Sequence, residues 1–176
     1  MRHFTVAARP VPDRACQAAS VYTGTMAKLH EYPVKVEWQG GRGGSGNVSS
    51  DRTGVSAALG VPKEFGGAGN GTNPEELLTH AVAACYSMTF GIIAENRKIP
   101  VAGLEVTAVG EVEESGPQFS YKKVTISPKI ALESGATEDQ VALAMDMAHK
   151  ADSYCIITNA IRGKVTIEVV PEILKT

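Results

Sequence analysis

TNPEELLTHAVAACYSM, residues Thr72 to Met88, carries the signals of a helix start followed by an apolar helix body. Asn73 can cap the helix, Pro74 stands at the first helical position, and Glu76 follows Asn73 by three residues, as in a capping box. The body that follows is apolar on nearly every side, and its three alanines, Ala81, Ala83 and Ala84, allow another backbone to approach closely. We therefore predict a helix that ends near Lys98, before Pro100, and that lies at the centre of the fold.

A cysteine, Cys85, lies in the middle of this helix, and a second, Cys155, follows a later predicted helix. Taken alone, the apolar helix favours an inert Cys85, because free cysteine is among the residues most often buried. The three cysteines, which include Cys16, are too few for a disulfide scaffold, and their spacing matches no structural zinc motif. The pattern is typical of the reducing cytoplasm, where thiols stay free for chemistry.

Composition limits the classes of partner. A net charge of −2 gives no electrostatic reason to expect nucleic acid or an anionic membrane, so we expect a small or protein-borne substrate. No run approaches the roughly eighteen apolar residues of a membrane span. Residues 1–27 contain arginines and prolines without a secretory signal's apolar segment, and we expect a poorly ordered extension there. Residues 28–176 are then predicted to form a single domain.

The rest of the chain alternates strand and helix signals. Residues 30–38 predict an edge strand, the glycine-rich residues 40–47 a tight turn, and residues 48–59 a second strand. A hairpin is expected from residues 104–112 and 121–132, with Pro128 near an edge or a bulge. Thr137 and Gln140 form a capping box for a second helix to about Asp152, and residues 165–170 close as a strand. Paired strands around two long helices indicate an α+β fold.

Four separated pieces, in this order, resemble one known family. They are the Arg-Gly-Gly-Ser-Gly segment from Arg42, the TNPEELL segment, the AACYSM segment around Cys85, and Cys155 before TNAIRG. Together they resemble the OsmC/Ohr family of thiol-dependent hydroperoxide reductases over roughly residues 28–176. NPEEL with CYSM resembles the OsmC branch, whereas GGRGG and TNAIRG are closer to Ohr. Cys155 is followed by isoleucine where the family commonly has proline.

The resemblance implies a fold of antiparallel sheets around two long central helices in an intertwined homodimer. It also implies roles for four residues: Cys85 reacts with peroxide, Cys155 resolves the product as a disulfide, Arg42 activates Cys85, and Glu75 holds Arg42. The expected activity is reduction of organic hydroperoxides to alcohols in oxidative-stress defence. No cofactor or metal is expected, and the reductant is an external thiol such as a lipoylated protein.

The residues allow part of this scheme to be checked physically. Cys85 lies about three turns inside its helix, beyond the reach of the helix dipole. A guanidinium about 4 Å away contributes roughly 4 kcal/mol at an effective dielectric of ~20, more than the about 2.7 kcal/mol needed to lower a thiol pKa by two units. Arg42 matches the family position, with Arg52 and Arg162 as competitors.

The position of Glu75 leaves two arrangements open. Glu75 precedes Cys85 by ten residues, or about 15 Å along a straight helix. Either Arg42 spans between them, or Glu75 of one subunit meets Cys85 of the other. A purely structural Glu75, placed favourably against the helix dipole, is the simpler alternative.

Three other classes of function are weighed against this one. A metal site from Cys85, Cys155, His80 and His149 has suitable ligand types, but His80 and Cys85 are off a common helix face. A cysteine hydrolase would need a histidine beside Cys85 with its own orienting partner. The main alternative is a non-enzymatic small-molecule-binding, or degenerate, member of the same fold.

Overall fold

The predicted central helix is α1 (Pro74–Arg97), and its ends follow from the residues there. In the computed structural model, which describes residues 27–175, the Asn73 side chain accepts a hydrogen bond of 2.8 Å from the Glu76 backbone N–H. The Glu76 carboxylate accepts from the Thr72 hydroxyl at 2.8 Å, so it binds the residue before the cap. Lys98 ends the helix in the left-handed conformation, with φ 54°. The extension predicted at residues 1–27 lies almost wholly outside the described residues.

The main sheet is built on the hairpin of β4 (Val101–Ser115) and β5 (Gln118–Leu132), which turns at Gly116 with φ 58°. On its other edge β5 pairs in parallel with β6 (Thr166–Val169) and then with β7 (Glu172–Lys175). The sequence predicted neither β7 nor this parallel pairing. The hairpin itself is confirmed.

Pro128 lies at neither an edge nor a bulge, contrary to the expectation. It stands opposite Val106 in the middle of the β4–β5 ladder. On the opposite side of β5, β6 pairs with residues 123–126 and β7 with residues 129–132, so Pro128 falls in the gap between the two short strands. A proline has no N–H to donate, and this gap is where the central strand does not need one.

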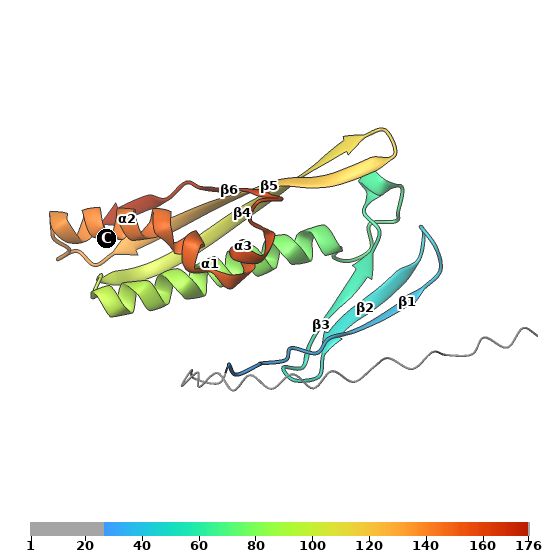
Figure 1. Ribbon diagram of the computed structural model, residues 1–176, viewed down its shortest axis with the longest axis horizontal. Helices are drawn as coiled ribbons and strands as arrows, with labels where there is room; N and C mark the ends of the chain where they lie inside the picture. The colour runs from blue at the N-terminus through green and yellow to red at the C-terminus, as the bar shows by residue number, and fades with distance from the viewer. Residues whose placement is uncertain (1–26, 176) are drawn as a thin grey trace, which may run out of the picture. The chain divides into compact units, whose positions relative to one another are not determined.

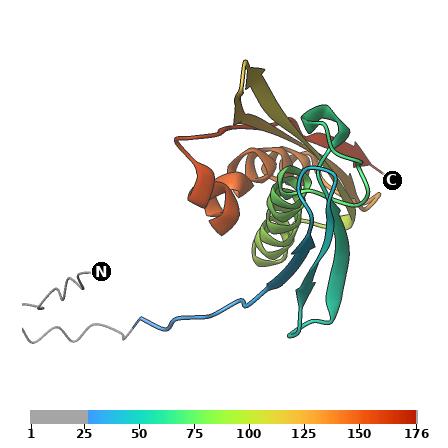
Figure 2. The ribbon, with the colours of Figure 1, turned by 90° about the vertical axis from the view of Figure 1, so that its right-hand side faces the viewer.

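Two further helices join α1 in a second layer that packs against the sheet: α2 (Glu138–Tyr154) and the short α3 (Ile156–Ile161). The predicted capping box is present in full, since Thr137 and Gln140 each accept from the other's backbone N–H. Figure 2 shows α1 and α2 under one face of the four-stranded sheet. The core lies between these two layers, and its largest fully buried side chains include Tyr86, Phe90, Ile126, Ile130 and Leu132.

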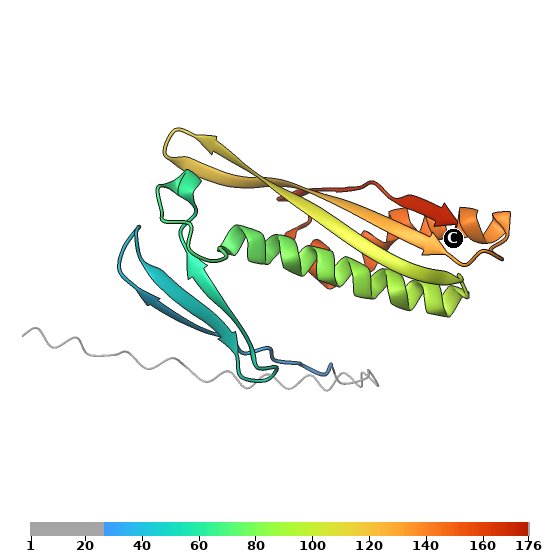
Figure 3. The ribbon, with the colours of Figure 1, turned by 180° about the vertical axis from the view of Figure 1, so that it is seen from behind.

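A separate three-stranded sheet precedes α1. It contains β1 (Lys35–Gln39), β2 (Ser45–Ser50) and β3 (Val55–Gly60), all antiparallel, and the short helix η1 (Lys63–Phe65) follows it. The single strand predicted over residues 48–59 is therefore wrong: a turn ending at Gly54, with φ 71°, divides it into two strands. Figures 1 and 3 show this sheet as an arm attached near the start of α1. We call strands β1–β3 the arm.

Residues 27–175 cover one face of α1 and leave the opposite face exposed. Val82, Tyr86, Phe90 and Ala94 are buried, while the opposite face exposes Met88 (69%) and Ile92 (59%). The arm also exposes apolar side chains, among them Val36, Trp38 and Val55.

The expectation that no segment is apolar enough to span a membrane needs correction. An 18-residue window of α1 has a mean hydropathy of 1.6, which qualifies by length and composition alone. A single such helix does not indicate a membrane protein, because the core helix of a folded domain has the same length and composition. Among the described residues, 22% of that window is buried, so most of it is at least partly exposed.

Candidate functional site

Cys85 and Cys155 meet where α1 packs against the junction of α2 and α3. The structure links them as a disulfide across 70 residues of sequence, with their Cα atoms 5.8 Å apart. This distance lies inside the range of about 4.4–6.8 Å in which disulfides form. The expectation that the fold brings the two cysteines within bonding reach is therefore met.

The two cysteines lie in different surroundings. Cys85 is half-buried on α1, whereas Cys155 has no exposed surface. Cys155 interrupts the helices with an extended conformation (φ −75°, ψ 122°), so it ends α2 and caps α3. Its sulfur accepts a hydrogen bond of 3.4 Å from the Thr158 backbone N–H. Cys85 is thus the more accessible of the two cysteines.

Tyr86 ties α1 to α2 beside this pair. Its hydroxyl donates to the Ala148 carbonyl at 2.7 Å, and the ring is fully buried. Burial, and secondarily the nearby Asp152 carboxylate, raise the pKa of Tyr86 well above its usual value. Tyr86 therefore acts as a neutral hydrogen-bond donor that fixes the helix spacing next to Cys85.

Glu75 lies in the first turn of α1, far from the cysteines. One of its carboxylate oxygens, Oε2, is buried and has no hydrogen-bond partner among residues 27–175. A helix of 1.5 Å rise per residue places Glu75 about 15 Å from Cys85. Among the described residues, Glu75 Oε2 is therefore a buried acceptor that lacks a donor.

Arg42 lies in the turn between β1 and β2 and is exposed. Its side chain rests on Gly66, where an added Cβ would come within 3.3 Å of Arg42 Cδ. In the part of the chain that the structure describes, Arg42 forms no ion pair or hydrogen bond. Phe65, the neighbour of Gly66, and Glu75 line one cavity of about 380 Å³, so Arg42 and Glu75 both lie near the start of α1. Neither forms a hydrogen bond or an ion pair with Cys85 or Cys155 in the described part of the chain.

Arg162, which the sequence left as a competitor of Arg42 for the role of activating Cys85, forms an ion pair with Asp152. Its Nη2 donates to Asp152 Oδ2 at 2.7 Å, and the Asp152 side chain is only 11% exposed. Asp152 and Thr158 were not singled out in the sequence, because nothing there indicated that Cys155 ends α2 and caps α3, with Asp152 three residues before it and Thr158 three residues after it. Arg52, the other competitor, also has an interaction partner.

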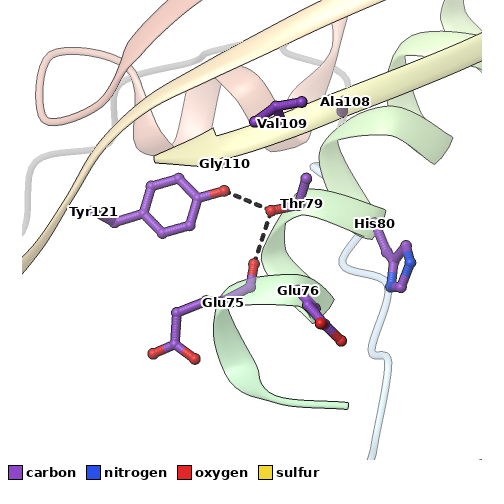
Figure 4. Close-up of a pocket in the computed structure, with 8 residues that line it drawn as sticks. All are labelled: Glu75, Glu76, Thr79, His80, Ala108, Val109, Gly110 and Tyr121. Carbon is purple, nitrogen blue, oxygen red and sulfur yellow. Dashed lines mark hydrogen bonds between the residues drawn. The ribbon is translucent and has the colours of Figure 1, made fainter. Parts of the chain in front are cut away.

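A second cavity, of about 500 Å³, lies beside the first two turns of α1. In Figure 4 the Tyr121 hydroxyl points at Thr79, 2.6 Å away, and Thr79 donates to the Glu75 carbonyl at 2.8 Å. His80 points away from Tyr121. Gly110 makes this possible, since a Cβ there would lie 2.0 Å from the Tyr121 hydroxyl. The cavity is lined by polar side chains from α1 and β5 but by neither Cys85 nor Cys155.

A metal centre has little support in this geometry. Among the described residues, no group of three His, Cys, Asp or Glu side chains is placed to hold a metal ion. The set weighed from the sequence, Cys85, Cys155, His80 and His149, does not form such a group. The chemistry available at the cysteine pair is thiol and disulfide chemistry.

Comparison with known proteins gives a consistent picture. Residues 67–170 match the family model described as OsmC-like protein. The chain is 34% identical to Uncharacterized protein YmaD of Bacillus subtilis, over 79% of this chain and 91% of that protein. It is 33% identical to the organic hydroperoxide resistance protein of Xanthomonas axonopodis pv. citri, over 77% and 91% respectively.

A solved structure agrees with these similarities in sequence. The organic hydroperoxide resistance protein OsmC of Legionella pneumophila superposes with a TM-score of 0.64 at 26% identity, covering 82% of this chain and 99% of that one. The α+β fold expected from the sequence is therefore the fold of these proteins.

Proposed function

Because the chain belongs to the OsmC-like protein family, we propose that it is a thiol-dependent reductase that converts organic hydroperoxides to alcohols. The observation that carries the proposal is the placement of Cys85 and Cys155 at a Cα distance of 5.8 Å, with Cys85 the more accessible of the two. Relatives named organic hydroperoxide resistance proteins support the choice of substrate class.

The reaction follows established thiol steps. The Cys85 thiolate attacks the outer peroxide oxygen, the O–O bond breaks, and the alcohol leaves after taking a proton, so that Cys85 becomes a sulfenic acid. The Cys155 thiol then attacks the Cys85 sulfur, a disulfide forms and water leaves. An external dithiol, such as a protein-bound dihydrolipoyl group, reduces the disulfide and is itself oxidised. We expect this chemistry in the cytoplasm, where such reductants are present.

Cys85 needs a nearby cation, and we propose that a second subunit supplies it. Among residues 27–175, Arg42 forms no ion pair or hydrogen bond, Glu75 Oε2 lacks a donor, and Glu75 lies about 15 Å along α1 from Cys85. A homodimer that brings Arg42 and Glu75 of one protomer to the cysteines of its partner would satisfy all three groups. The guanidinium would stabilise the thiolate and hydrogen-bond a peroxide oxygen.

The apolar surface of the single chain supports the same arrangement. The exposed face of α1 carries Met88 and Ile92, and the arm carries Val36, Trp38 and Val55. Exposed apolar side chains gathered on one surface are typical of an interface with another protein chain. A second copy that packs its own α1 and arm against these faces would bury them and build the site in one step.

The first experiment counts thiols in the fully reduced protein before and after one equivalent of cumene hydroperoxide, with intact mass. The Cys16→Ser background leaves only the two cysteines of interest, so we expect loss of both thiols and a decrease of about 2 Da. Cys85→Ser should consume no peroxide at a catalysed rate, and Cys155→Ser should stop at the sulfenic acid. Thiols that react no faster than free cysteine would contradict the proposal and favour a binding protein.

A second experiment tests the shared site. Cys85→Ser and Glu75→Gln homodimers, each of low activity, are mixed and allowed to exchange subunits. If Glu75 serves the partner's cysteines, each mixed dimer contains one intact site and activity returns. If each site lies within one subunit, every site carries a defect and activity stays low.

A further inference from the structure

Cys155 has an extended backbone conformation that no neighbouring proline enforces. It stands in an extended conformation between two helices, and the first residue of α3 is Ile156, not the proline that would fix φ there. The helix hydrogen bonds are interrupted at this point. Some other set of bonds must therefore hold the Cys155 sulfur toward Cys85.

Asp152 supplies the first set. Its backbone carbonyl accepts from the Cys155 N–H (3.2 Å), the Thr158 hydroxyl and Arg162 Nη2 (3.3 Å). Its carboxylate accepts from Arg162 Nη2 at 2.7 Å. One residue in the last turn of α2 thus binds the turn at Cys155, the first turn of α3 and the residue after α3.

Asn159 supplies the second set. Arg162 Nε donates to Asn159 Oδ1 at 3.1 Å, and Asn159 Nδ2 donates to the Ser153 carbonyl at 2.9 Å. The bonds therefore cross Cys155 on both sides, from residues 152–153 to residues 158–162. We call Asp152, Asn159 and Arg162 the clamp.

The clamp matters because a disulfide requires a narrow range of distances between its two cysteines. At 5.8 Å, the two Cα atoms are at the separation most common for disulfides, and an increase of about 1 Å would reach the upper limit. A misplacement of about 1 Å can slow a positioned reaction by about 100-fold. Breaking the Asp152–Arg162 pair would also leave a nearly buried carboxylate without its partner, which drives the junction to rearrange.

We propose that Asp152, Asn159 and Arg162 are positioning residues that hold Cys155 ready to condense with the Cys85 sulfenic acid, and so protect Cys85 from overoxidation. This inference rests on the proposed peroxidase function. The sulfenic acid has two fates: Cys155 attacks its sulfur and water leaves, or a second hydroperoxide oxidises it to a sulfinic acid and departs as alcohol. Holding Cys155 in place favours the first fate.

The test uses Arg162→Gln in the Cys16→Ser background and measures both steps. The rate at which the first peroxide is consumed should stay within about 2-fold of the parent. The ratio of sulfinic acid (+32 Da) to disulfide (−2 Da) at fixed excess cumene hydroperoxide should rise on the order of 10- to 100-fold. Lys150→Gln is the matched control. It breaks the ion pair of 2.7 Å between Asp146 and Lys150, which lies on α2 as Asp152 does but makes no bond across Cys155. An unchanged ratio in Arg162→Gln would overturn the proposal.

Two further variants keep the test decisive if Arg162→Gln does not fold. Asn159→Ala removes one exposed member of the clamp, and Arg162→Lys keeps the charge beside Asp152 but loses the bond to Asn159. Both should raise the sulfinic ratio, by less than the full loss of Arg162. Parent-like ratios in both variants would overturn the proposal.

A measurement without peroxide separates this inference from the proposed function. In glutathione buffers, the equilibrium ratio of disulfide to dithiol reports how well Cys155 is placed for Cys85. We expect this ratio to fall about 10-fold or more in Arg162→Gln or Arg162→Lys and to stay unchanged in Lys150→Gln. A parent that forms the disulfide but does not reduce peroxide would refute the function alone, whereas an unchanged ratio would refute the clamp alone.

Discussion

Oxidation of the Cys85–Cys155 pair should stabilise the folded chain by an amount that follows from its place in the sequence. The bond closes a loop of 70 residues, and restricting such a loop in the unfolded chain is worth about 4 kcal/mol at 25 °C in the chain-entropy model. For a chain of this size, about 1 kcal/mol corresponds to roughly 2–4 °C in Tm. The oxidised protein should therefore melt about 10 °C higher than the reduced protein.

The assay compares fully oxidised and fully reduced protein by chemical and thermal unfolding. Both forms must be at one protein concentration, because dimerisation would make Tm depend on concentration. Cys16→Ser removes the third thiol, and Cys155→Ser in that background is the control that cannot form the bond. The parent should gain stability on oxidation, and the control should not.

Two outcomes would refute this reasoning. Equal stability of the oxidised and reduced parent would mean that the reduced, unfolded chain is already constrained, or that native strain cancels the entropy term. An equal gain in the Cys155→Ser control would show that oxidation acts elsewhere in the chain. Either result would remove loop closure as the source of the effect.

Three smaller predictions concern single side chains. Tyr86→Phe should cost about 1 kcal/mol of unfolding free energy by removing the bond to Ala148. Because the pKa of Tyr86 is raised from 10.0 in the folded state, the native protein should also lose up to about 1.4 kcal/mol per pH unit above pH 10, and Tyr86→Phe should abolish that loss in urea titrations. Thr137→Ala should cost about 0.5–2 kcal/mol by removing the capping box of α2, measured by urea unfolding. Gly110→Ala should cost about 1–3 kcal/mol, because its Cβ would meet the Tyr121 hydroxyl, and Gly110→Ala/Tyr121→Ala should recover part of this cost.

Local signals in the sequence predicted the elements that depend on neighbouring residues. The Asn73 cap, the Thr137–Gln140 capping box and the hairpin turn at Gly116 all form within a few residues, so the sequence contains the whole cause. The turn that divides residues 48–59 was missed although Asp51 and Gly54 are residues that favour turns. The parallel strand β7 was missed because its pairing partner lies some forty residues earlier, in β5.

The candidate site divides in the same way. The sequence motifs identified Cys85, Cys155, Arg42 and Glu75, and their catalytic roles remain predictions. Only the tertiary structure decided that the Cα atoms of Cys85 and Cys155 lie 5.8 Å apart, that Arg162 pairs with Asp152, and that Glu75 Oε2 has no donor among the described residues. These relations join residues ten to seventy positions apart. Helical and strand periodicity relates only near neighbours on one element, so contacts at such separations are set by packing between elements.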